Sequence, residues 1–246
     1  MSRITFENFA ARAQQAISYT EMAGRHSIQA EPEKNVPADV AGKLELCAND
    51  SLLEIGCGTG NLLLPVSHLV RTATGLDHAA ILEVLRSRLR EETNITLIPG
   101  NFLDVTLNEQ FSKILIYSVL HYLTDQAEVL EFIRRAVSLL APGGMLLLGD
   151  IPNKDKHRRF LASERGKRFE SEWSRTVAAQ ASKPVELPAL RTLPQDDKLA
   201  DFDDGSILEI LRSARQSGLE AYVLRQSEDL PVCFSREDIL IHRLAL

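Results

Sequence analysis

The chain has 246 residues, of which 44% are hydrophobic and 25% charged, the balance of a folded globular protein with a full core. This composition excludes a disordered, collagen-like or coiled-coil chain. Lys and Arg number 28 against 34 Asp and Glu, so the net charge is −6. Proteins that wrap nucleic acid need many cations facing phosphates, and we therefore expect no nucleic-acid partner.

The cysteines and the start of the chain bear on compartment. Three widely spaced cysteines, with no C-x-x-C pair and no Cys/His cluster at zinc spacing, predict reduced thiols and no metal site; they are Cys47, Cys57 and Cys233. The first residues lack the apolar core and cleavage site of a secretory signal. The apolar run 114–123 is shorter than the roughly 18 to 20 residues that span a membrane. The sequence thus predicts a soluble, cytoplasmic protein.

The first part of the chain is helical and the middle alternates. Residues 5–24 have apolar positions at helical spacing, and Pro32 and Pro37 precede a short helix over Val40–Leu46, so residues 1–47 form a predicted N-terminal helical cap. Nearly unbroken apolar runs then predict strands of a parallel sheet at Ser51–Gly56, Ala73–Asp77, Ile95–Ile98, Ile114–Ser118 and Met145–Gly149. Helical patterns separate them at Asn61–Leu69, Ala79–Glu91 and between Asp125 and Pro142, where Glu128 completes a capping box.

The alternation of strand and helix patterns stops after the fifth strand and resumes near Ser206. Residues 151–204 hold one long helical pattern, roughly Lys154–Ser182, followed by a loop that contains Pro184, Pro188 and Pro194. Ser206 and Glu209 form a second capping box for a helix that Gly218 ends, and the last strands are Ala221–Leu224 and Asp238–His242. Alternation over a hundred residues predicts an α/β fold with a doubly wound sheet, in a single domain (1–246) that carries an insertion.

A glycine-rich turn follows the first predicted strand. Glycines at the carboxyl end of a strand let backbone N–H groups approach a ligand closely. The dinucleotide fingerprint G-x-G-x-x-G fails in both registers, because Asn61 and Leu63 stand where its third glycine would be. What remains is an acid followed by G-x-G-x-G, formed by Glu54, Gly56, Gly58 and Gly60.

This pattern resembles motif I of the class I S-adenosylmethionine-dependent methyltransferases, and the resemblance extends from Leu52 to the end of the chain. It implies a Rossmann-like fold: a seven-stranded, mostly parallel sheet with an antiparallel last strand, here with a helical lid at 151–204. It implies S-adenosylmethionine as the cofactor. The residues that it places beside the cofactor are Glu54, Gly56, Cys57, Gly58, Gly60, Asp77, His78, Asn101, Phe102, Tyr117 and Ser118.

Two of these positions carry specific expectations. A carboxylate at Asp77 can accept hydrogen bonds from both ribose hydroxyls. Asn101 stands where the family usually has an acid that binds the adenine amino group, and its amide oxygen can accept the same bond, with Phe102 flanking the ring. Ser112 replaces an acid often found near the start of the fourth strand. These departures keep open a catalytically idle cofactor-binding subunit, and another transferase on the same scaffold, such as an aminopropyl transferase, is a second alternative.

The segment after the fourth strand indicates the substrate class. It lacks the Pro-Pro-aromatic motif of DNA amino-methyltransferases and the paired glutamates of protein arginine methyltransferases, and Asp150 and Asn153 are not the adjacent pair of metal-dependent enzymes. A small-molecule acceptor remains. Residues 149–156 and 235–241 are similar to methyltransferases of surface-polysaccharide biosynthesis, which implies a sugar hydroxyl or amine as acceptor. Homo-oligomers stay possible.

The insertion is basic. Residues 153–183 contain nine Lys and Arg against four acids, a charge of +5, which could attract a phosphorylated or nucleotide-linked sugar. The alternative is a solvated face whose cations pair with nearby acids; these are Asp196, Asp197, Asp201, Asp203 and Asp204.

Methyl transfer from a sulfonium is an in-line displacement, so the protein mainly aligns the reactants and excludes water. A hydroxyl acceptor also needs a base that titrates near neutral pH. His121 is the first candidate, Asp150 could orient it or take the proton, and His157 is a further option; each could equally be structural. Phe169 and Trp173 line either the acceptor site or the core.

Overall fold

The computed structural model describes residues 6–7, 29–91, 93–181 and 199–245. The predicted helix over 5–24, apart from its residues 6 and 7, and the predicted loop through the three prolines of 184–194 lie outside the described residues.

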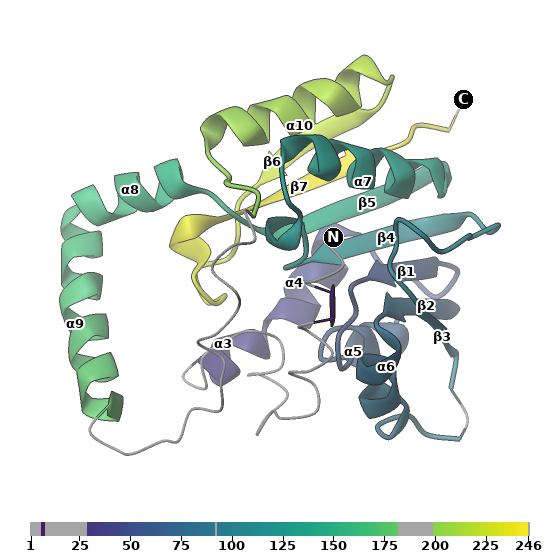
Figure 1. Cartoon of the computed structure of the whole chain (residues 1–246), viewed down its shortest axis with the longest axis horizontal. Helices are drawn as coiled ribbons and strands as arrows, with labels where there is room; N and C mark the ends of the chain where they lie inside the picture. Colours follow the sequence, from purple (N-terminus) through teal and green to yellow (C-terminus); the bar gives the residue numbers. More distant parts are fainter. Residues whose placement is uncertain (1–5, 8–28, 92, 182–198, 246) are drawn as a thin grey trace.

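A seven-stranded sheet forms the centre of the described part of the chain, in the order β3-β2-β1-β4-β5-β7-β6 (Figure 1). Neighbours pair in parallel except for β7, which is antiparallel to both β5 and β6. The predicted doubly wound, mostly parallel sheet with an antiparallel last strand is confirmed. The strands are β1 (Ser51–Ile55), β2 (Thr72–Asp77), β3 (Ile95–Pro99), β4 (Phe111–Tyr117), β5 (Leu140–Pro152), β6 (Glu220–Leu224) and β7 (Arg236–His242).

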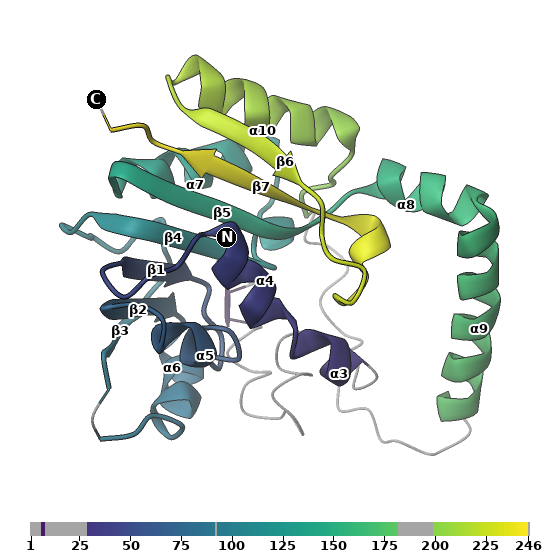
Figure 2. The ribbon, with the colours of Figure 1, turned by 180° about the vertical axis from the view of Figure 1, so that it is seen from behind.

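Helices cover both faces of this sheet, which explains the unbroken apolar runs of its strands. Along β4, Ile114 and Ile116 face a core shared with α7 (Gln126–Ser138) and α10 (Asp204–Gln216). Leu115 and Tyr117, between and after them, face a second core shared with α4 (Val36–Lys43), α5 (Leu63–Ser67) and α6 (Ala79–Arg86). Figures 1 and 2 show these two helical layers from opposite sides.

Two predicted caps have different outcomes. Asp125 caps α7 as predicted, its carboxylate accepting from Glu128 N at 2.9 Å, although Glu128 reaches back to Thr124 N rather than to the cap residue. The cap predicted at Ser206 is wrong. Asp203 caps α10 and accepts from the Ser206 amide at 2.9 Å, because a carboxylate three residues before an amide satisfies it better than a hydroxyl already inside the helix.

The fifth strand is longer than predicted. α7 ends at Ser138 and β5 begins at Leu140, so the Pro-Gly-Gly segment lies inside the strand instead of before it. At its other end β5 continues to Pro152, paired with Arg236 of β7. The antiparallel partner extends the strand beyond the reach of its parallel neighbour β4, which no local pattern reveals.

The predicted helix over Lys154–Ser182 is two helices, α8 (Lys154–Ala162) and α9 (Glu164–Ala181). Ser163 between them is extended, and its hydroxyl accepts from Gly166 N at 3.0 Å, an N-cap bond that starts α9 in a new direction. In Figure 1 the two helices form an arm at one side of the molecule.

Smaller boundary differences concern prolines and helix ends. Pro32 lies within the short helix α3 (Ala30–Glu33) and Pro37 in the first turn of α4, where the missing amide hydrogen costs nothing. The predicted helix over Val40–Leu46 therefore begins four residues earlier, and α6 ends at Arg86, before the predicted Glu91.

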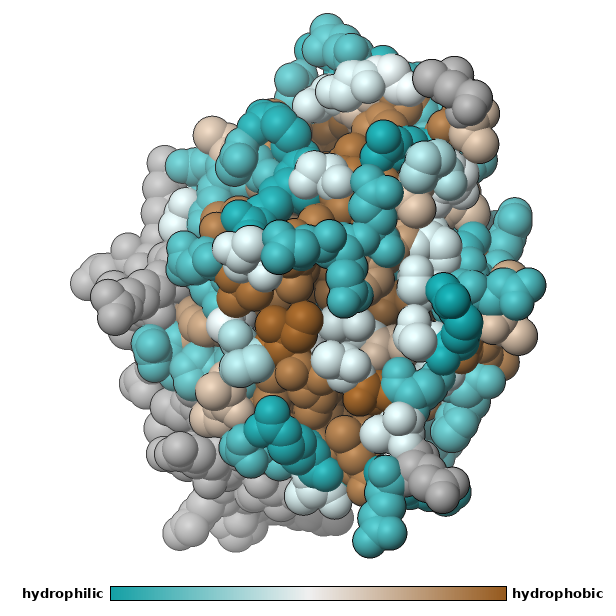
Figure 3. Space-filling view, turned by 90° about the vertical axis from the view of Figure 1, so that its right-hand side faces the viewer, coloured by the Kyte–Doolittle hydropathy of each residue, from teal (hydrophilic) through white to brown (hydrophobic). Residues whose placement is uncertain are grey.

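The edge of the sheet where the parallel strands begin faces the viewer in Figure 3, where polar residues surround a strip of apolar ones. None of the helices that the structure describes is both long and apolar enough to cross a bilayer. The strand beginnings carry the family departure at Ser112, whose hydroxyl donates to Asp50 Oδ1 at 2.8 Å and accepts from Ser51 N at 2.9 Å. Asp50 thus supplies the acid there, and Ser112 has no bearing on a site at the other edge.

Candidate active site

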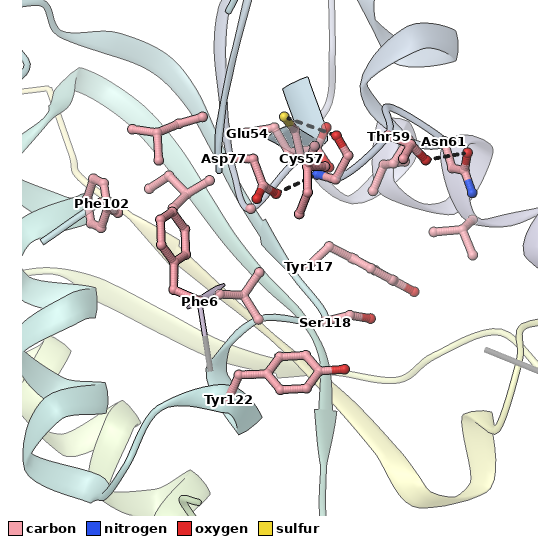
Figure 4. Close-up of a pocket in the computed structure, with 18 of the residues that line it drawn as sticks. Phe6, Glu54, Cys57, Thr59, Asn61, Asp77, Phe102, Tyr117, Ser118 and Tyr122 are labelled. Carbon is pink, nitrogen blue, oxygen red and sulfur yellow. Dashed lines mark hydrogen bonds between the residues drawn. The ribbon is translucent and has the colours of Figure 1, made fainter. Parts of the chain in front are cut away.

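A pocket opens at the carboxyl ends of β1, β2, β3 and β4 (Figure 4). The structure brings together nine of the eleven residues predicted to contact the cofactor, all of them in the pocket wall. They are Glu54, Gly56, Cys57, Gly58, Asp77, Asn101, Phe102, Tyr117 and Ser118.

The loop after β1 needs its glycines for two different reasons. Gly58 has φ +54° with open space around a hypothetical Cβ, so only its backbone conformation requires glycine. Gly56, at φ +79°, also has no room, because a Cβ would collide with the side chain of Val119. Gly60 lies outside the pocket wall, where a Cβ would collide with Leu85 of α6, so it serves the close packing of loop and helix.

Asp77, at the end of β2, holds the glycine loop in place. Its Oδ2 accepts from Gly58 N at 2.7 Å and its Oδ1 from His78 N at 2.6 Å. Burial raises the pKa of the Asp77 carboxyl, and these two backbone bonds oppose the rise. The carboxylate lines the pocket where the resemblance implies the cofactor's ribose.

Glu54 is the most informative residue of the pocket. It lies on β1 with 3% exposure, and its Oε2 has no hydrogen-bond partner among the described residues. Burial, and then the charge of Asp77, raise the pKa of the Glu54 carboxyl well above its usual range. A buried carboxylate without a partner is costly, and a ligand that brings a cation or a hydrogen-bond donor removes that cost. The ammonium of S-adenosylmethionine fits this requirement.

His78 is not in the pocket wall. Its Nδ1 accepts from Ala80 N at 3.1 Å, so the imidazole caps α6, and its Nε2 lies 3.5 Å from Glu7 Oε2. The ring meets Phe6 edge-on, with centroids 4.9 Å apart. Phe6 itself lines the pocket, so His78 contacts the site from behind.

Two residues with left-handed backbone meet at the ends of β4 and β5. Ser118 and Asp150 both have φ +58°, unusual for residues other than glycine. The Ser118 hydroxyl donates to Asp150 Oδ2, and Arg236 Nε lies 3.6 Å from Asp150 Oδ1. Ser118 lines the pocket, whereas Asp150 is buried behind it. The structure thus connects the predicted catalytic carboxylate to the pocket through one hydroxyl.

The candidate histidines lie elsewhere. His121 belongs to the 3-10 helix η2 (Leu120–Tyr122), outside the pocket wall, with its ring centroid 4.2 Å from that of Tyr122. His157 is exposed on α8, 6.1 Å from the Phe234 ring. Phe169 packs against Phe234 at 4.4 Å, in agreement with a packing role, while the side chain of Trp173 lies outside the described residues.

The sequence analysis missed several residues of the pocket. Tyr122 also lines the pocket and lies, in Figure 4, on the side of Ser118 away from the glycine loop, and Val119 fills the turn beneath Gly56. The predicted N-terminal cap supplies three further lining residues, Glu33, Val36 and Pro37. Asn61 Nδ2 donates to Glu33 Oε1 at 3.4 Å and joins the cap to the loop. Apolar residues beside a proline were the only signal of this contact.

The basic insertion pairs with acids. Lys154 Nζ lies 2.5 Å from Asp201 Oδ2, Arg159 Nη1 lies 2.5 Å from Asp204 Oδ2, and Arg158 pairs with Asp155 within α8. Three of these cations therefore have partners on or near the insertion itself. Among the described residues of the pocket wall, the charged ones are acids: Glu33, Glu54 and Asp77.

Comparison with known proteins agrees with this geometry. Residues 52–144 match the family model of the methyltransferase domain. Over these residues the chain is similar to a methyltransferase domain. The matched residues hold most of β1, all of β2 to β4, α7 and the glycine loop, and S-adenosylmethionine is the cofactor that the resemblance implies for such a domain.

Nodulation protein S of Bradyrhizobium diazoefficiens is 32% identical over 100 residues, which are 40% of this chain and 48% of that protein. The chain spans about half the length of the curated methyltransferases it matches, and 3% of chondramide synthase of Chondromyces crocatus.

Solved structures share the whole fold. The N-methyltransferase NodS from Bradyrhizobium japonicum, in complex with S-adenosyl-L-homocysteine, superposes with a TM-score of 0.59 at 17% identity and covers 97% of this chain and 96% of its own. Phosphoethanolamine N-methyltransferase 1 of Haemonchus contortus, bound to phosphoethanolamine and S-adenosylhomocysteine, gives a TM-score of 0.69 at 14% identity, covering 98% of this chain and 49% of that one.

Proposed function

We propose that the protein transfers the methyl group of S-adenosylmethionine to a small-molecule acceptor. One observation carries the proposal: the buried carboxylate Oε2 of Glu54, without a hydrogen-bond partner among the described residues, stands in the pocket beside the glycine loop. A cationic ligand would complete a site of this kind. The cofactor supplies an ammonium and a sulfonium.

The acceptor that we propose is an amine or hydroxyl of a sugar-like molecule, with the amine favoured. The charged residues in the described pocket wall are acids, which attract an ammonium and repel a phosphate. The cations Lys154, Arg158 and Arg159, which would suit a phosphorylated or nucleotide-linked sugar, are paired with acids instead. N-methyltransferases among proteins of the same fold support an amine as well.

The pocket residues divide the work of a displacement reaction. In this proposal Glu54 holds the cofactor's ammonium, Asp77 its ribose hydroxyls and Asn101 its adenine amino group, which fixes the methyl group toward the end of β4. Alignment of that kind lowers the barrier, because it makes the reaction of acceptor and methyl group effectively unimolecular. The bound cofactor supplies the activated methyl, and the acceptor atom attacks it as the sulfur leaves with the bonding electron pair.

Proton removal is assigned to the Ser118–Asp150 pair. The Ser118 hydroxyl faces the pocket and already donates to Asp150 Oδ2, so it can take a proton from the acceptor as it passes its own to the carboxylate. His121 lies behind Tyr122, outside the pocket wall, and on this proposal it packs the turn rather than acting as the base.

Two measurements test the proposal. Calorimetric titration with S-adenosylhomocysteine should give saturable binding to the purified chain, and its absence would overturn the cofactor assignment. Release of S-adenosylhomocysteine is then measured with glucosamine, N-acetylglucosamine and glucosamine 6-phosphate as acceptor probes. We expect faster turnover with glucosamine than with the other two probes. Tight binding without turnover on any amine or hydroxyl probe would favour the idle cofactor-binding subunit.

A further inference from the structure

Asp238 is a buried acid on β7 that belongs to no part of the pocket wall. It is 0% exposed and accepts hydrogen bonds from three places in the chain. Lys43 Nζ donates to its Oδ2 at 2.7 Å, while Asp150 N and Gln226 Nε2 each donate to its Oδ1 at 2.8 Å. The carboxylate therefore joins segments that are far apart in sequence.

The first connection leads to the N-terminal cap. Lys43 is the last residue of α4, the helix whose first residues, Val36 and Pro37, line the pocket. The lysine side chain is only 11% exposed, and its second partner is Asp39 at 2.5 Å. Figure 2 shows α4 lying across the sheet from the pocket side toward β5 and β7. The Lys43–Asp238 bond thus fixes the far end of the helix that forms one pocket wall.

The second connection leads to the opposite wall. The β5–β7 register shifts between Leu148 and Ile151, and Asp150 sits in this irregularity with left-handed backbone. Its amide donates to Asp238 instead of to a ladder partner, and its carboxylate accepts from the Ser118 hydroxyl. Ser118, also left-handed, faces the pocket. Such conformations persist in residues other than glycine only where surrounding contacts hold them.

We propose that Asp238 is a positioning residue, which couples the cap helix α4 to the Asp150–Ser118 turn and so sets the separation of the two pocket walls around the cofactor. This inference rests on the proposed function, because it concerns the same pocket. It assigns to Lys43 and Asp238 an effect on ligand binding, although neither lines the pocket.

The test uses variants that cut one connection at a time, with S-adenosylhomocysteine as the probe. In Asp238→Asn the amide oxygen still accepts from Asp150 N and Gln226, but the charge opposite Lys43 is lost. Lys43→Met removes the same bond from the other side. For each we expect a dissociation constant about tenfold higher, or about 1.4 kcal/mol. The double variant should bind no worse than either single one, because all three lack one shared bond.

The double variant also guards against misfolding if Lys43→Met alone fails to fold, because it removes the fully buried charge of Asp238 together with that of Lys43 and leaves only Asp39 without its partner. Asp39→Asn is the matched control: it removes the other partner of Lys43 and leaves Asp238 bonded, so binding should stay within about twofold of wild type. Amide hydrogen exchange provides a second readout. S-adenosylhomocysteine should protect amides of 36–43 in the wild type but not in Asp238→Asn, while those of 56–60 are protected in both.

The outcomes are distinct. A wild type that does not bind S-adenosylhomocysteine overturns the proposed function. A wild type that binds, with folded variants whose affinity and exchange pattern do not change, overturns only the role given to Asp238. Additive effects of the two substitutions would also overturn it, because they would mean that Lys43 and Asp238 act separately.

Discussion

The glycine-loop edge of the sheet and the arm formed by α8 and α9 are opposites in how they carry charge. At the edge, Glu54 is buried and Asp77 is half-buried, and loss of solvation raises the pKa of each carboxyl. On the arm the charged side chains are exposed and satisfied locally: Arg159 is 59% exposed and pairs with Asp204, and Arg165 is 65% exposed and pairs with Glu228.

This difference teaches that a charge count does not locate a ligand site. The net charge of +5 over 153–183 marks a region in which acids placed by the fold meet cations at the surface, where pairs contribute little. Composition does not single out the two acids of the pocket. The buried Glu54 carboxylate, however, has an oxygen without a hydrogen-bond partner among the described residues, which a ligand can supply. The predictions below test this contrast, from the largest expected effect to the smallest.

Asp77→Ala should have the largest effect. On the proposed placement it removes two hydrogen bonds from the cofactor's ribose to a charged acceptor, each worth about 1.5–3 kcal/mol, so the affinity for S-adenosylhomocysteine should fall at least about tenfold. It also leaves the amides of Gly58 and His78 without the carboxylate to which they donate. Asp77→Asn keeps one acceptor oxygen, so its affinity for S-adenosylhomocysteine should lie between those of the wild type and Asp77→Ala. Calorimetric titration measures this, and a folded Asp77→Ala protein with wild-type affinity would contradict the placement.

Glu54→Gln should separate binding from stability. Because the pKa of the Glu54 carboxyl is raised in the folded protein, the neutral form favours folding. This contribution to the free energy of unfolding is present below the ordinary pKa of 4.5 and is lost as the pH rises through the raised pKa of the folded protein. At neutral pH the empty Glu54→Gln protein should therefore melt higher, by about 2–4 °C for each kcal/mol recovered. The difference should vanish below pH 4.5.

Affinity for the cofactor should move the other way in Glu54→Gln. Loss of the carboxylate opposite the ammonium should weaken S-adenosylhomocysteine binding by about fivefold or more. Glu83→Gln on α6, an exposed residue paired with Arg86, is the control and should change neither quantity measurably. A Glu54→Gln protein that melts at the wild-type temperature and binds as tightly would mean that a partner already satisfies the Glu54 carboxylate.

The sequence indicated much of this edge because motifs there are local. Glycines follow a strand within a few residues, and Asp77 follows the next strand in the same way, so nine of eleven predicted contacts are in the pocket wall. His78 was misplaced because a histidine after a strand can equally begin a helix, and here it caps α6. The seven strands and the antiparallel last strand came from the family resemblance, whereas the order of the strands was not predicted.

What the sequence could not indicate is contact between distant segments. The cap residues Val36 and Pro37 reach the pocket only because α4 packs on the sheet, and Asp238 meets Lys43 across 195 positions. The length of β5 depends on its pairing with β7. The break between α8 and α9 at Ser163 depends on a single cap bond within a continuous helical pattern. No periodicity in the chain encodes such contacts.

Asn101 tests how closely the site follows the family. Its Oδ1 accepts from Leu103 N at 3.2 Å, and it lines the pocket beside Phe102. If its amide oxygen also accepts from the adenine amino group, Asn101→Asp should retain or tighten S-adenosylhomocysteine binding, since a carboxylate is the stronger acceptor. Asn101→Leu should weaken it about fivefold. Equal affinities of all three proteins would place the adenine elsewhere.

The smallest effect is expected on the arm, in the double variant Arg158→Gln/Arg159→Gln. Both guanidinium groups are exposed and paired, with Asp155 and Asp204, so S-adenosylhomocysteine affinity should stay within about twofold of wild type. Arg212→Gln on α10, which breaks an equally exposed ion pair with Glu209, is the matched control.

The acceptor assay decides what the arm does. For glucosamine the Michaelis constant should not change. A contrary result has three parts: in the wild type the Michaelis constant for glucosamine 6-phosphate is lower than that for glucosamine, it rises in the double variant, and the difference between wild type and variant disappears as salt increases. The arginines would then be attracting a phosphate, because exposed charges are screened beyond about 8 Å at physiological ionic strength. That result would replace the amine by an anionic acceptor, and would make the arm a lid rather than a solvated face.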